Sequence, residues 1–394
     1  MRLWMQPGKD LVNARRDHSR QQRRRGVALV ASLAAATGAL AGCSGGPGGS
    51  APSGPASWLS SIPDTAAYRS LIAVNDLRTL WTSAGLSFPP AVARLRSAAG
   101  SAASRQIGRG SPLGTELLSI SGFTGRPLGY SPLAISSEVA AGSPPNQLSL
   151  VNGTIDASKL KMALSHLGAR PAATGSVVTY TYRYNLRTSS PVAGALIGVR
   201  HIAVAGGGDR AASGGPGAPS GDVAGLLKGS RPSRSLASDA DVRQMLGLLK
   251  GADVMLFGTS LIINWERGIL GIHAAPAQVA ALRHRYPGLA RLPAATFGGY
   301  GYLPGNPEHG TAVAVSIYPS SNDATTAASV LGTMLRSGTS FLTSKPYAKL
   351  FAVDKITVDG HAVVARITTH ASWTLAQAAQ QGDFPLFWTS KSTA

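Results

Sequence analysis

Residues 311–338 read TAVAVSIYPSSNDATTAASVLGTMLRSG, and this stretch carries the pattern on which the fold is built. Residues 311–318 alternate between apolar and small side chains, which predicts a strand. Asn322 or Asp323 is then placed to cap a helix, which Gly338 ends. The residues predicted to face the core are Val313, Val315, Ile317, Ala327, Ala328, Leu331 and Met334.

The same unit of strand, cap, helix and glycine occurs twice earlier in the chain. One copy consists of Leu71–Val74, a cap at Asn75 or Asp76, and Gly85; the other of Leu148–Ile155, a cap at Asp156, and Gly168. The spacing of the three copies is too uneven for a solenoid. Repeated α+β modules are one interpretation, and the other is that any α+β protein yields such units.

Further strands and helices complete the expected fold. Asp359-Gly360 between Leu350–Val358 and His361–Thr369 predicts a β-hairpin. Ser238–Leu249, with Ser238 and Asp241 resembling a capping box, predicts a helix. Strands are also predicted at Val177–Tyr184, Arg200–Ala205, Val254–Phe257 and Leu261–Trp265, and helices at Pro276–Tyr286 and from Ser372 to Gly382. We predict an α+β fold of antiparallel sheets with helices packed on one face, in two related lobes.

The order of apolar and Gly/Pro/Ser-rich stretches predicts five parts of the chain. These are a leader (1–42), a flexible tether (43–57), an N-terminal α+β lobe (58–205), a flexible Gly/Pro/Ser loop (206–221) and a C-terminal α+β lobe (222–394). The two low-complexity parts contain few residues that can bury apolar surface.

The leader has the features of a lipoprotein signal peptide. Arg23-Arg24-Arg25 precedes the apolar run Gly26–Leu40, which is shorter than the roughly 20 residues of a membrane-spanning helix. Leu40-Ala41-Gly42-Cys43 resembles the bacterial lipobox, and this resemblance implies lipidation of Cys43 and cleavage before it. Two fatty-acyl chains such as palmitate would then hold the protein at the extracytoplasmic face of the cell membrane. The alternative is an ordinary signal peptide with a chance cysteine. Export by the general or by the twin-arginine route stays open.

Composition restricts the kinds of partner and cofactor. The full chain has a formal charge of +19; residues 1–42 hold eight Lys/Arg and two Asp/Glu, which leaves +13 beyond them. Such a charge favours an anionic cell-envelope polymer or lipid, although compositional bias explains part of it. Export and the lack of Lys/Arg runs interleaved with aromatics argue against nucleic acid. With Cys43 as the single cysteine and scattered histidines, no metal site and no cofactor is predicted.

Candidate site residues are few. Tyr180, Tyr182 and Tyr184 share one strand face and could stack on a ligand, and a half-buried strand face explains them equally. Glu308-His309 could act as an acid–base couple, and its alternative is a solvated turn. Glu266 is the carboxylate most exposed to desolvation, and its alternative is a salt bridge. Asp239 and Asp241 could hold a cation, and their alternative is helix capping. The last candidate is the apolar stretch Phe384–Trp388. It could contact lipid or a partner, and the alternative is that it docks the chain end on the core.

Five stretches resemble a family of actinobacterial lipoproteins with no assigned activity. They are Ile62–Thr65 with Val74–Asp76, Gly142–Pro145, Gly153–Asp156 and Ser235–Val242, and they span roughly residues 58 to 250. Thr154 stands where the family often has a bulky aromatic residue. The resemblance implies an envelope location and an α+β body, with no catalytic residues to transfer.

The leading hypothesis is a membrane-anchored, non-enzymatic lipoprotein that binds or organises an envelope component. A lipid carrier with an apolar cavity is the alternative, and a cell-wall hydrolase with an unfamiliar site is the third. The oligomeric state is not predicted.

Overall fold

The computed structural model describes most of the chain after residue 53. The described residues are 54–97, 100–101, 130–143, 145–174, 177–184, 198–205, 209–271, 275–305, 310–369 and 373–390. All of them belong to one compact unit, Gly49–Ala394. The first described element is the 3-10 helix η1 (Gly54–Ser61), in which Ala56 is buried. The folded body therefore begins before residue 58, so the predicted tether ends earlier than expected.

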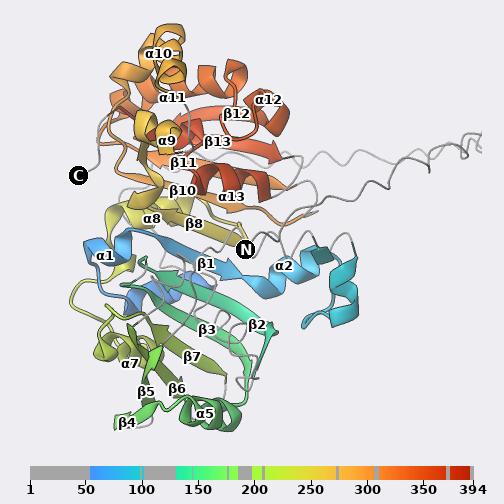
Figure 1. Cartoon of the computed structure of the whole chain (residues 1–394), viewed down its shortest axis with the longest axis vertical. Helices are drawn as coiled ribbons and strands as arrows, with labels where there is room; N and C mark the ends of the chain where they lie inside the picture. The colour runs from blue at the N-terminus through green and yellow to red at the C-terminus, as the bar shows by residue number, and fades with distance from the viewer. Residues whose placement is uncertain are drawn as a thin grey trace, which may run out of the picture. The chain divides into compact units, whose positions relative to one another are not determined.

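A single sheet organises the described residues (Figure 1). Its twelve strands follow the order β12-β13-β11-β10-β8-β1-β2-β3-β7-β6-β5-β4, and every neighbouring pair is antiparallel. The strands are β1 (Ile72–Asp76), β2 (Tyr130–Ala141), β3 (Leu148–Ile155), β4 (Arg170–Thr174), β5 (Val177–Tyr184), β6 (Gly198–Ala205), β7 (Arg210–Gly214), β8 (Val254–Gly258), β10 (Phe297–Tyr302), β11 (Thr311–Ile317), β12 (Phe351–Asp359) and β13 (Ala362–Thr369). The predicted α+β class with antiparallel pairing is confirmed.

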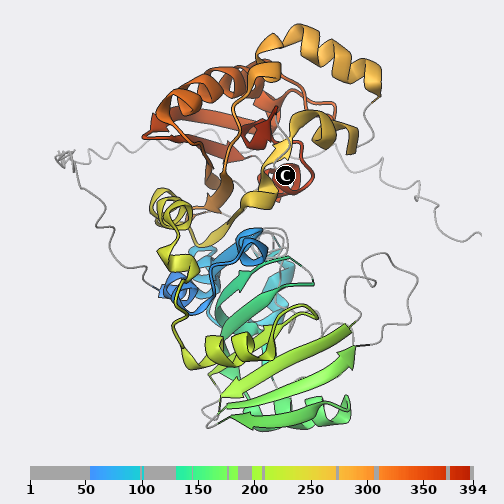
Figure 2. The same cartoon turned by 90° about the vertical axis from the view of Figure 1, so that its left-hand side faces the viewer.

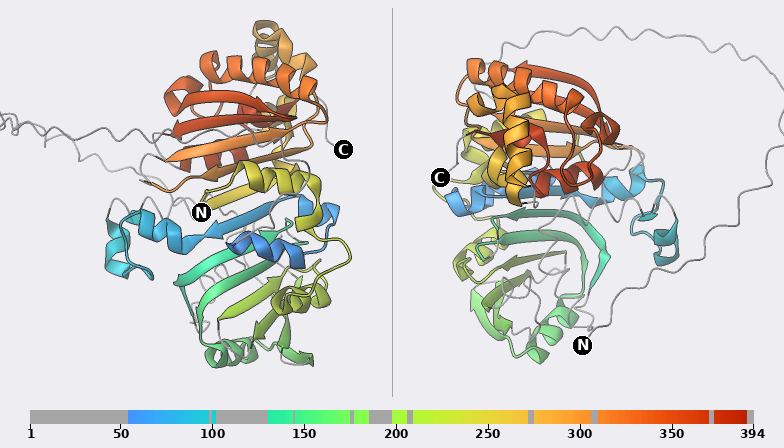
Figure 3. Two further views of the ribbon diagram at one scale, coloured as in Figure 1. Left: turned by 180° about the vertical axis from the view of Figure 1, so that it is seen from behind. Right: turned by 45° about the horizontal axis from the view of Figure 1, so that its top comes forward.

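Each half of the chain supplies one half of this sheet. β1 to β7 lie on one side and β8 to β13 on the other, and β1 pairs with β8 where the halves meet. Figure 3 shows the two halves, blue to green and yellow to red, joined at these central strands. The two lobes expected from the sequence thus share one continuous sheet.

Helices cover both faces of the sheet and not the single face expected from the sequence, because the central strands carry apolar side chains on both sides. Ala312 and Ala314 of β11 pack in one core cluster with α11, while Val315 and Ile317 pack in another with α8. The helices are α1 (Ala66–Arg69), α2 (Leu77–Ser83), η2 (Val92–Arg96), α5 (Ala157–His166), α7 (Ser220–Lys228), η3 (Leu236–Ser238), α8 (Ala240–Leu248), η4 (Thr259–Leu261), α9 (Trp265–Gly271), α10 (Pro276–Arg285), η5 (Pro287–Arg291), α11 (Ser321–Ser337), α12 (Tyr347–Leu350), α13 (Trp373–Gln380) and η6 (Pro385–Phe387).

The three predicted strand–helix units are present as β1–α2, β3–α5 and β11–α11. Asp76 and Asp156 cap the first two helices by accepting a backbone N–H three residues on. The third cap is Ser320, which accepts from the N–H of Asp323, rather than Asn322 or Asp323. Any of these short polar side chains can cap, so sequence alone does not choose among them.

One further cap and one strand differ from the sequence prediction. Asp239 caps α8 by accepting from Val242 N at 3.0 Å, and the capping box formed by Ser235 and Ser238 belongs to η3 instead. The predicted strand at Leu261–Trp265 is shorter than expected, because η4 ends at Leu261 and α9 begins at Trp265. The strand that forms there is β9 (Ile263–Asn264), which pairs in parallel with β14 (Trp388–Thr389). Short apolar runs do not distinguish strand from helix.

The prediction of a flexible loop at 206–221 is wrong for its described part. Residues 210–214 form β7, which pairs with both β3 and β6. Its small side chains let α7 pack closely: a Cβ at Gly214 would lie 2.5 Å from Cγ2 of Val223. The low apolar content therefore reflects close packing between strands and a helix.

Candidate functional site

The lipidation site predicted from the sequence, Cys43, lies outside the described residues, as do the leader and Glu308-His309. None of the described helices has the length and apolar character that crossing a bilayer requires. Within the described chain, no group of three or more His, Cys, Asp or Glu side chains is arranged to hold a metal ion.

The tyrosine face of β5 points into the protein. Tyr180 is 6% exposed and Tyr182 is 4% exposed, and both pack in the core cluster that contains Leu160 and Leu164 of α5. The side chain of Tyr184 lies outside the described residues. Tyr180 and Tyr182 therefore serve as core residues, and their rings do not form a surface platform for stacking.

The other candidates have structural roles. Glu266 forms an ion pair with Arg283 of α10, which matches the salt-bridge interpretation. Asp239 caps α8, which matches the capping interpretation. Phe384, Phe387 and Trp388 are at most 2% exposed and pack in the core. The chain end therefore docks on the body, as the second interpretation of Phe384–Trp388 expected.

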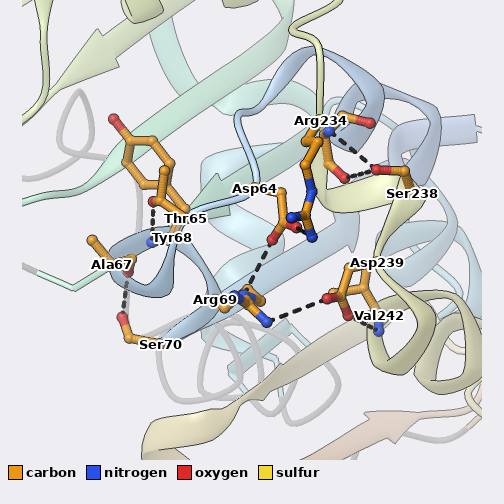
Figure 4. A network of polar contacts seen from close by, with 11 residues as sticks. Asp64, Thr65, Ala67, Tyr68, Arg69, Ser70, Arg234, Ser238, Asp239 and Val242 are labelled. Atoms are coloured by element: carbon orange, nitrogen blue, oxygen red, sulfur yellow. Dashed lines mark hydrogen bonds and ion pairs between the residues drawn. The ribbon is translucent and has the colours of Figure 1, made fainter.

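Four charged side chains tie the start of the body to the segment before α8 (Figure 4). The Asp64 carboxylate, whose side chain is 1% exposed, lies 3.1 Å from Nε of Arg69 and 3.1 Å from Nη2 of Arg234. Nη1 of Arg69 donates to Oδ2 of Asp239 at 3.3 Å. We call Asp64, Arg69, Arg234 and Asp239 the charge clamp.

Backbone contacts reinforce the charge clamp. The N–H of Asp64 donates to the carbonyl of Arg234 at 3.0 Å, and that of Leu236 donates to the carbonyl of Ile62 at 2.9 Å. Ile62 and Asp64 belong to one of the stretches that carry the family resemblance, Leu236 belongs to another, and Arg234 lies just before the latter. These two stretches therefore meet in space although Asp64 and Arg234 are 170 residues apart. The outermost group is the Arg234 side chain, which is 77% exposed. The clamp therefore presents positive charge outward and buries its carboxylate.

A second group of polar side chains lies inside the sheet, on the central strands. Asn75 of β1 and Glu138 of β2 are register partners, both fully buried, and Asn75 Nδ2 donates to Oε2 of Glu138 at 3.3 Å. Oδ1 of Asn75 has no hydrogen-bond partner among the described residues. Burying these groups costs stability unless they are paired, so the pair specifies the register of β1 on β2.

Asp253, just before β8, is a buried carboxyl group with a raised pKa. It is 5% exposed, and its backbone carbonyl accepts from the N–H of Asp76 at 2.7 Å. Burial, assisted by the negative charge of Asp76 and opposed by a hydrogen bond with Ser83, raises the pKa of Asp253 to about 7. The folded protein therefore holds a proton that the unfolded chain releases at lower pH.

We expect Asp253 to make the protein less stable as the pH rises. Between about pH 5 and pH 8 the free energy of unfolding should fall by about 2–3 kcal/mol, because the unfolded chain has already lost the proton and the folded chain loses it only near the raised pKa. The stabilisation is complete on the acid side and is lost as the pH passes about 7. Urea unfolding at both pH values, for the natural chain and for Asp253→Asn, measures it. Equal pH dependence in the two proteins would refute the assignment.

Another buried carboxylate, Asp383, is fully hydrogen-bonded. It is 1% exposed and lies just after Gly382, which has a φ of +74°. The hydroxyls of Ser340 and Tyr347 donate to it at 2.6 and 2.7 Å, and the N–H groups of Phe341 and Leu342 donate at 3.1 and 3.2 Å. Burial and the carboxylate raise the pKa of Tyr347 well above its usual value. Asp383 therefore holds the turn after α11 against the chain end.

Comparison with known proteins leaves the family open. No protein-family profile matches the chain, and no curated protein matches it. Crystal structures of TP0453 in crystal forms I and IV are similar, with TM-scores of 0.40 and 0.38 and identities of 10% and 8%. They cover 84% and 82% of this chain and 99% and 98% of theirs. The resemblance to actinobacterial lipoproteins therefore stays a prediction.

Proposed function

We propose that this chain is a lipoprotein anchored through Cys43 to the outer side of the cell membrane, where it binds or organises an anionic component of the envelope without catalysing a reaction. The observation that carries the proposal is the stretch of residues 23–43, with three arginines, a short apolar run and Leu-Ala-Gly before the cysteine. Each feature has a physical purpose in export and acylation. The anionic component is a cell-wall polymer or a lipid headgroup.

The distribution of charge in the body supports an anionic partner. Among the described acidic residues, Glu138, Asp253 and Asp383 are at most 5% exposed, and the Asp64 side chain is 1% exposed. Lys and Arg side chains at the surface include Lys228, Arg231, Arg243, Arg285, Arg291 and Arg336. Because buried carboxylates are screened from an approaching partner, the surface is more positive than the formal charge of the chain indicates.

The roles of Glu266, Asp239 and Asp383 support binding over catalysis. Glu266 is held by Arg283, and Asp239 is shared between a helix cap and Arg69. A general acid or base must reach a substrate, and the fully hydrogen-bonded Asp383 has its acceptor atoms turned inward. These carboxylates maintain the fold.

We expect binding to the envelope to depend on salt. Mature protein in a neutral detergent should be retained on beads coated with delipidated cell-wall polymer, with anionic phospholipid, or with both at about 0.05 M salt. It should be released at about 1 M salt, where the Debye length falls to roughly 3 Å. Cellulose beads are the neutral control. Salt-independent retention, or no retention on either anionic surface, would contradict the proposal.

A further inference from the structure

One basic surface lies beside the first residues of the body. The segment between α7 and η3, residues 229–235, joins two helices that both contact η1, and Pro63 and Ser235 form an isolated β-bridge. Figure 2 shows this yellow-green segment beside the blue start of the body. The described body therefore begins, with η1, beside the helices that flank this segment.

The segment is fixed to the body at both ends, so its charges have defined positions. At its start Gly229 has a φ of +71° and caps α7, and the N–H of Ser230 donates to the carbonyl of Gly225 at 2.9 Å. At its end Arg234 pairs with Asp64 in the charge clamp. The backbone between these two points is therefore restrained, and so are the positions of the side chains that it carries.

The charges on this surface are mainly positive. Lys228, Arg231 and Arg243 are exposed, and no ion pair to a described residue engages them. We call these three residues, together with Arg234, the basic surface. Most of the nearby carboxylates have internal partners: Asp64 and Asp239 belong to the charge clamp, and Asp222 accepts from the hydroxyl of Tyr68 at 2.9 Å. Asp241, half-buried on α8, is the remaining acid.

The length of the connecting chain keeps this surface close to the membrane. Eleven peptide steps separate Cys43 from Gly54, which at full extension span about 40 Å. A lipid on Cys43 would confine the start of the body within that distance of the bilayer. Attraction between basic side chains and anionic lipid acts within a Debye length of about 8–10 Å, so the anchor brings the basic surface repeatedly within range.

We propose that the basic surface docks on the anionic headgroups of the same membrane that holds the lipid anchor, and so orients the body on the bilayer. This inference rests on the proposed function and names the envelope component as lipid. It assigns the basic surface a role as a second membrane contact. A lipid chain combined with a basic patch is a general means of stable membrane attachment.

A different basic region offers a matched control. Arg285, whose guanidinium lies 5.4 Å from the ring centre of Tyr286, Arg291 of η5 and Arg336 of α11 are exposed. Figures 1 and 2 both show α10 at a distance from α1, beside which the basic surface lies. Removing these three charges changes the net charge as much as removing Lys228, Arg231 and Arg243.

The test uses the chain's lack of other cysteines. With Cys43 blocked by lipid, Ser233→Cys introduces a single reactive thiol on the exposed segment, and Ala290→Cys does so on η5. The lipidated protein is placed in vesicles of phosphatidylcholine alone or with phosphatidylglycerol. Energy transfer from a fluorophore at residue 233 or 290 to headgroup-labelled lipid reports how close each position lies to the bilayer.

We expect transfer from position 233, and not from position 290, to increase in anionic vesicles and to fall at high salt. Lys228→Gln/Arg231→Gln/Arg243→Gln should reduce the docked-to-undocked ratio by about a hundredfold, since each basic residue near an anionic surface contributes a factor of roughly five. Arg285→Gln/Arg291→Gln/Arg336→Gln should leave the ratio unchanged. Equal effects of the two triple variants, or no difference between the vesicles, would overturn the inference.

The failures of the two proposals are distinguishable. The intact mass of the same sample reports whether Cys43 carries lipid, which tests the proposed function. If Cys43 carries the lipid but energy transfer from position 233 is the same in anionic and neutral vesicles, the docking proposal fails and the proposed anchoring stands. If the first triple variant does not fold, the salt dependence of the unsubstituted surface still decides. Salt-sensitive retention on cell-wall polymer alone would show a polymer as the partner and overturn docking on lipid.

Discussion

Cys43→Ala is expected to abolish incorporation of fatty acid into the protein and to leave the leader attached. The thioether needs a sulfur nucleophile, and Cys43 is the single cysteine of the chain. Without it no second attachment point exists, so the effect should be complete. Both consequences can be measured by growing cells with labelled palmitate, purifying the protein, and comparing its label and its chain length. The natural chain should be labelled and shorter; the variant should be unlabelled and longer.

Ser44→Ala is the matched control for this experiment. It changes the neighbouring residue by one oxygen and leaves Leu40-Ala41-Gly42-Cys43 intact, so labelling and cleavage should match those of the natural chain. Label retained by the Cys43→Ala variant would place the acyl chains elsewhere, and the anchoring account would then be wrong.

Asp383→Ala is expected to destabilise the folded body by about 3–5 kcal/mol. The substitution removes the acceptor of four hydrogen bonds, and Ser340 and Tyr347 would then each bury a hydroxyl that has lost this partner. Two backbone N–H groups lose their acceptor as well. Urea unfolding, monitored by tryptophan fluorescence because Trp388 packs against Tyr347, measures the loss.

Asp354→Ala is the control for the loss of a carboxylate. Asp354 is exposed on β12 and accepts one hydrogen bond, from the hydroxyl of Thr368 at 3.1 Å. Because water can replace this bond, we expect a loss below about 1 kcal/mol. If both variants lost a similar free energy of unfolding, the burial and hydrogen bonding of Asp383 would not determine how much it stabilises the fold.

The strand–helix units and the hairpin could be predicted from the sequence, because residues close to one another in the chain determine them. β3 and α5 are examples: the strand spans Leu148–Ile155 as expected, Asp156 caps the helix, and Gly168 has a φ of +74° beyond its end. The hairpin at Asp359-Gly360 is similar, with Gly360 at a φ of +59°. Alternation, cap and turn chemistry are readable within a few residues.

The features that depend on distant residues could not be predicted. β7 looked like a flexible loop because its residues are small, and it becomes a strand because Leu148 of β3 pairs with Gly214. The charge clamp is another case, since Asp64 and Arg234 are ordinary surface residues until the fold joins them. The order of strands in the sheet likewise depends on pairing across the whole chain.

The candidate sites show the same division. The tyrosines of β5 share a face as predicted, but which face of the strand is buried depends on α5 packing over Tyr180 and Tyr182. Asp383 was missed, although its position between Gly382 and the apolar run Phe384–Trp388 is a sequence signal for a buried carboxylate that needs donors. Asp253 carries no such signal, since its raised pKa comes from burial and from Asp76.

The account depends most on the state of one sulfur atom, and the intact mass of the mature protein tests it directly. Protein purified from the membrane of its own cells should begin at Cys43 and carry a diacylglyceryl group on that residue. A chain that still contains residues 1–42, or one that begins at Cys43 with a free thiol, would contradict the proposed anchoring.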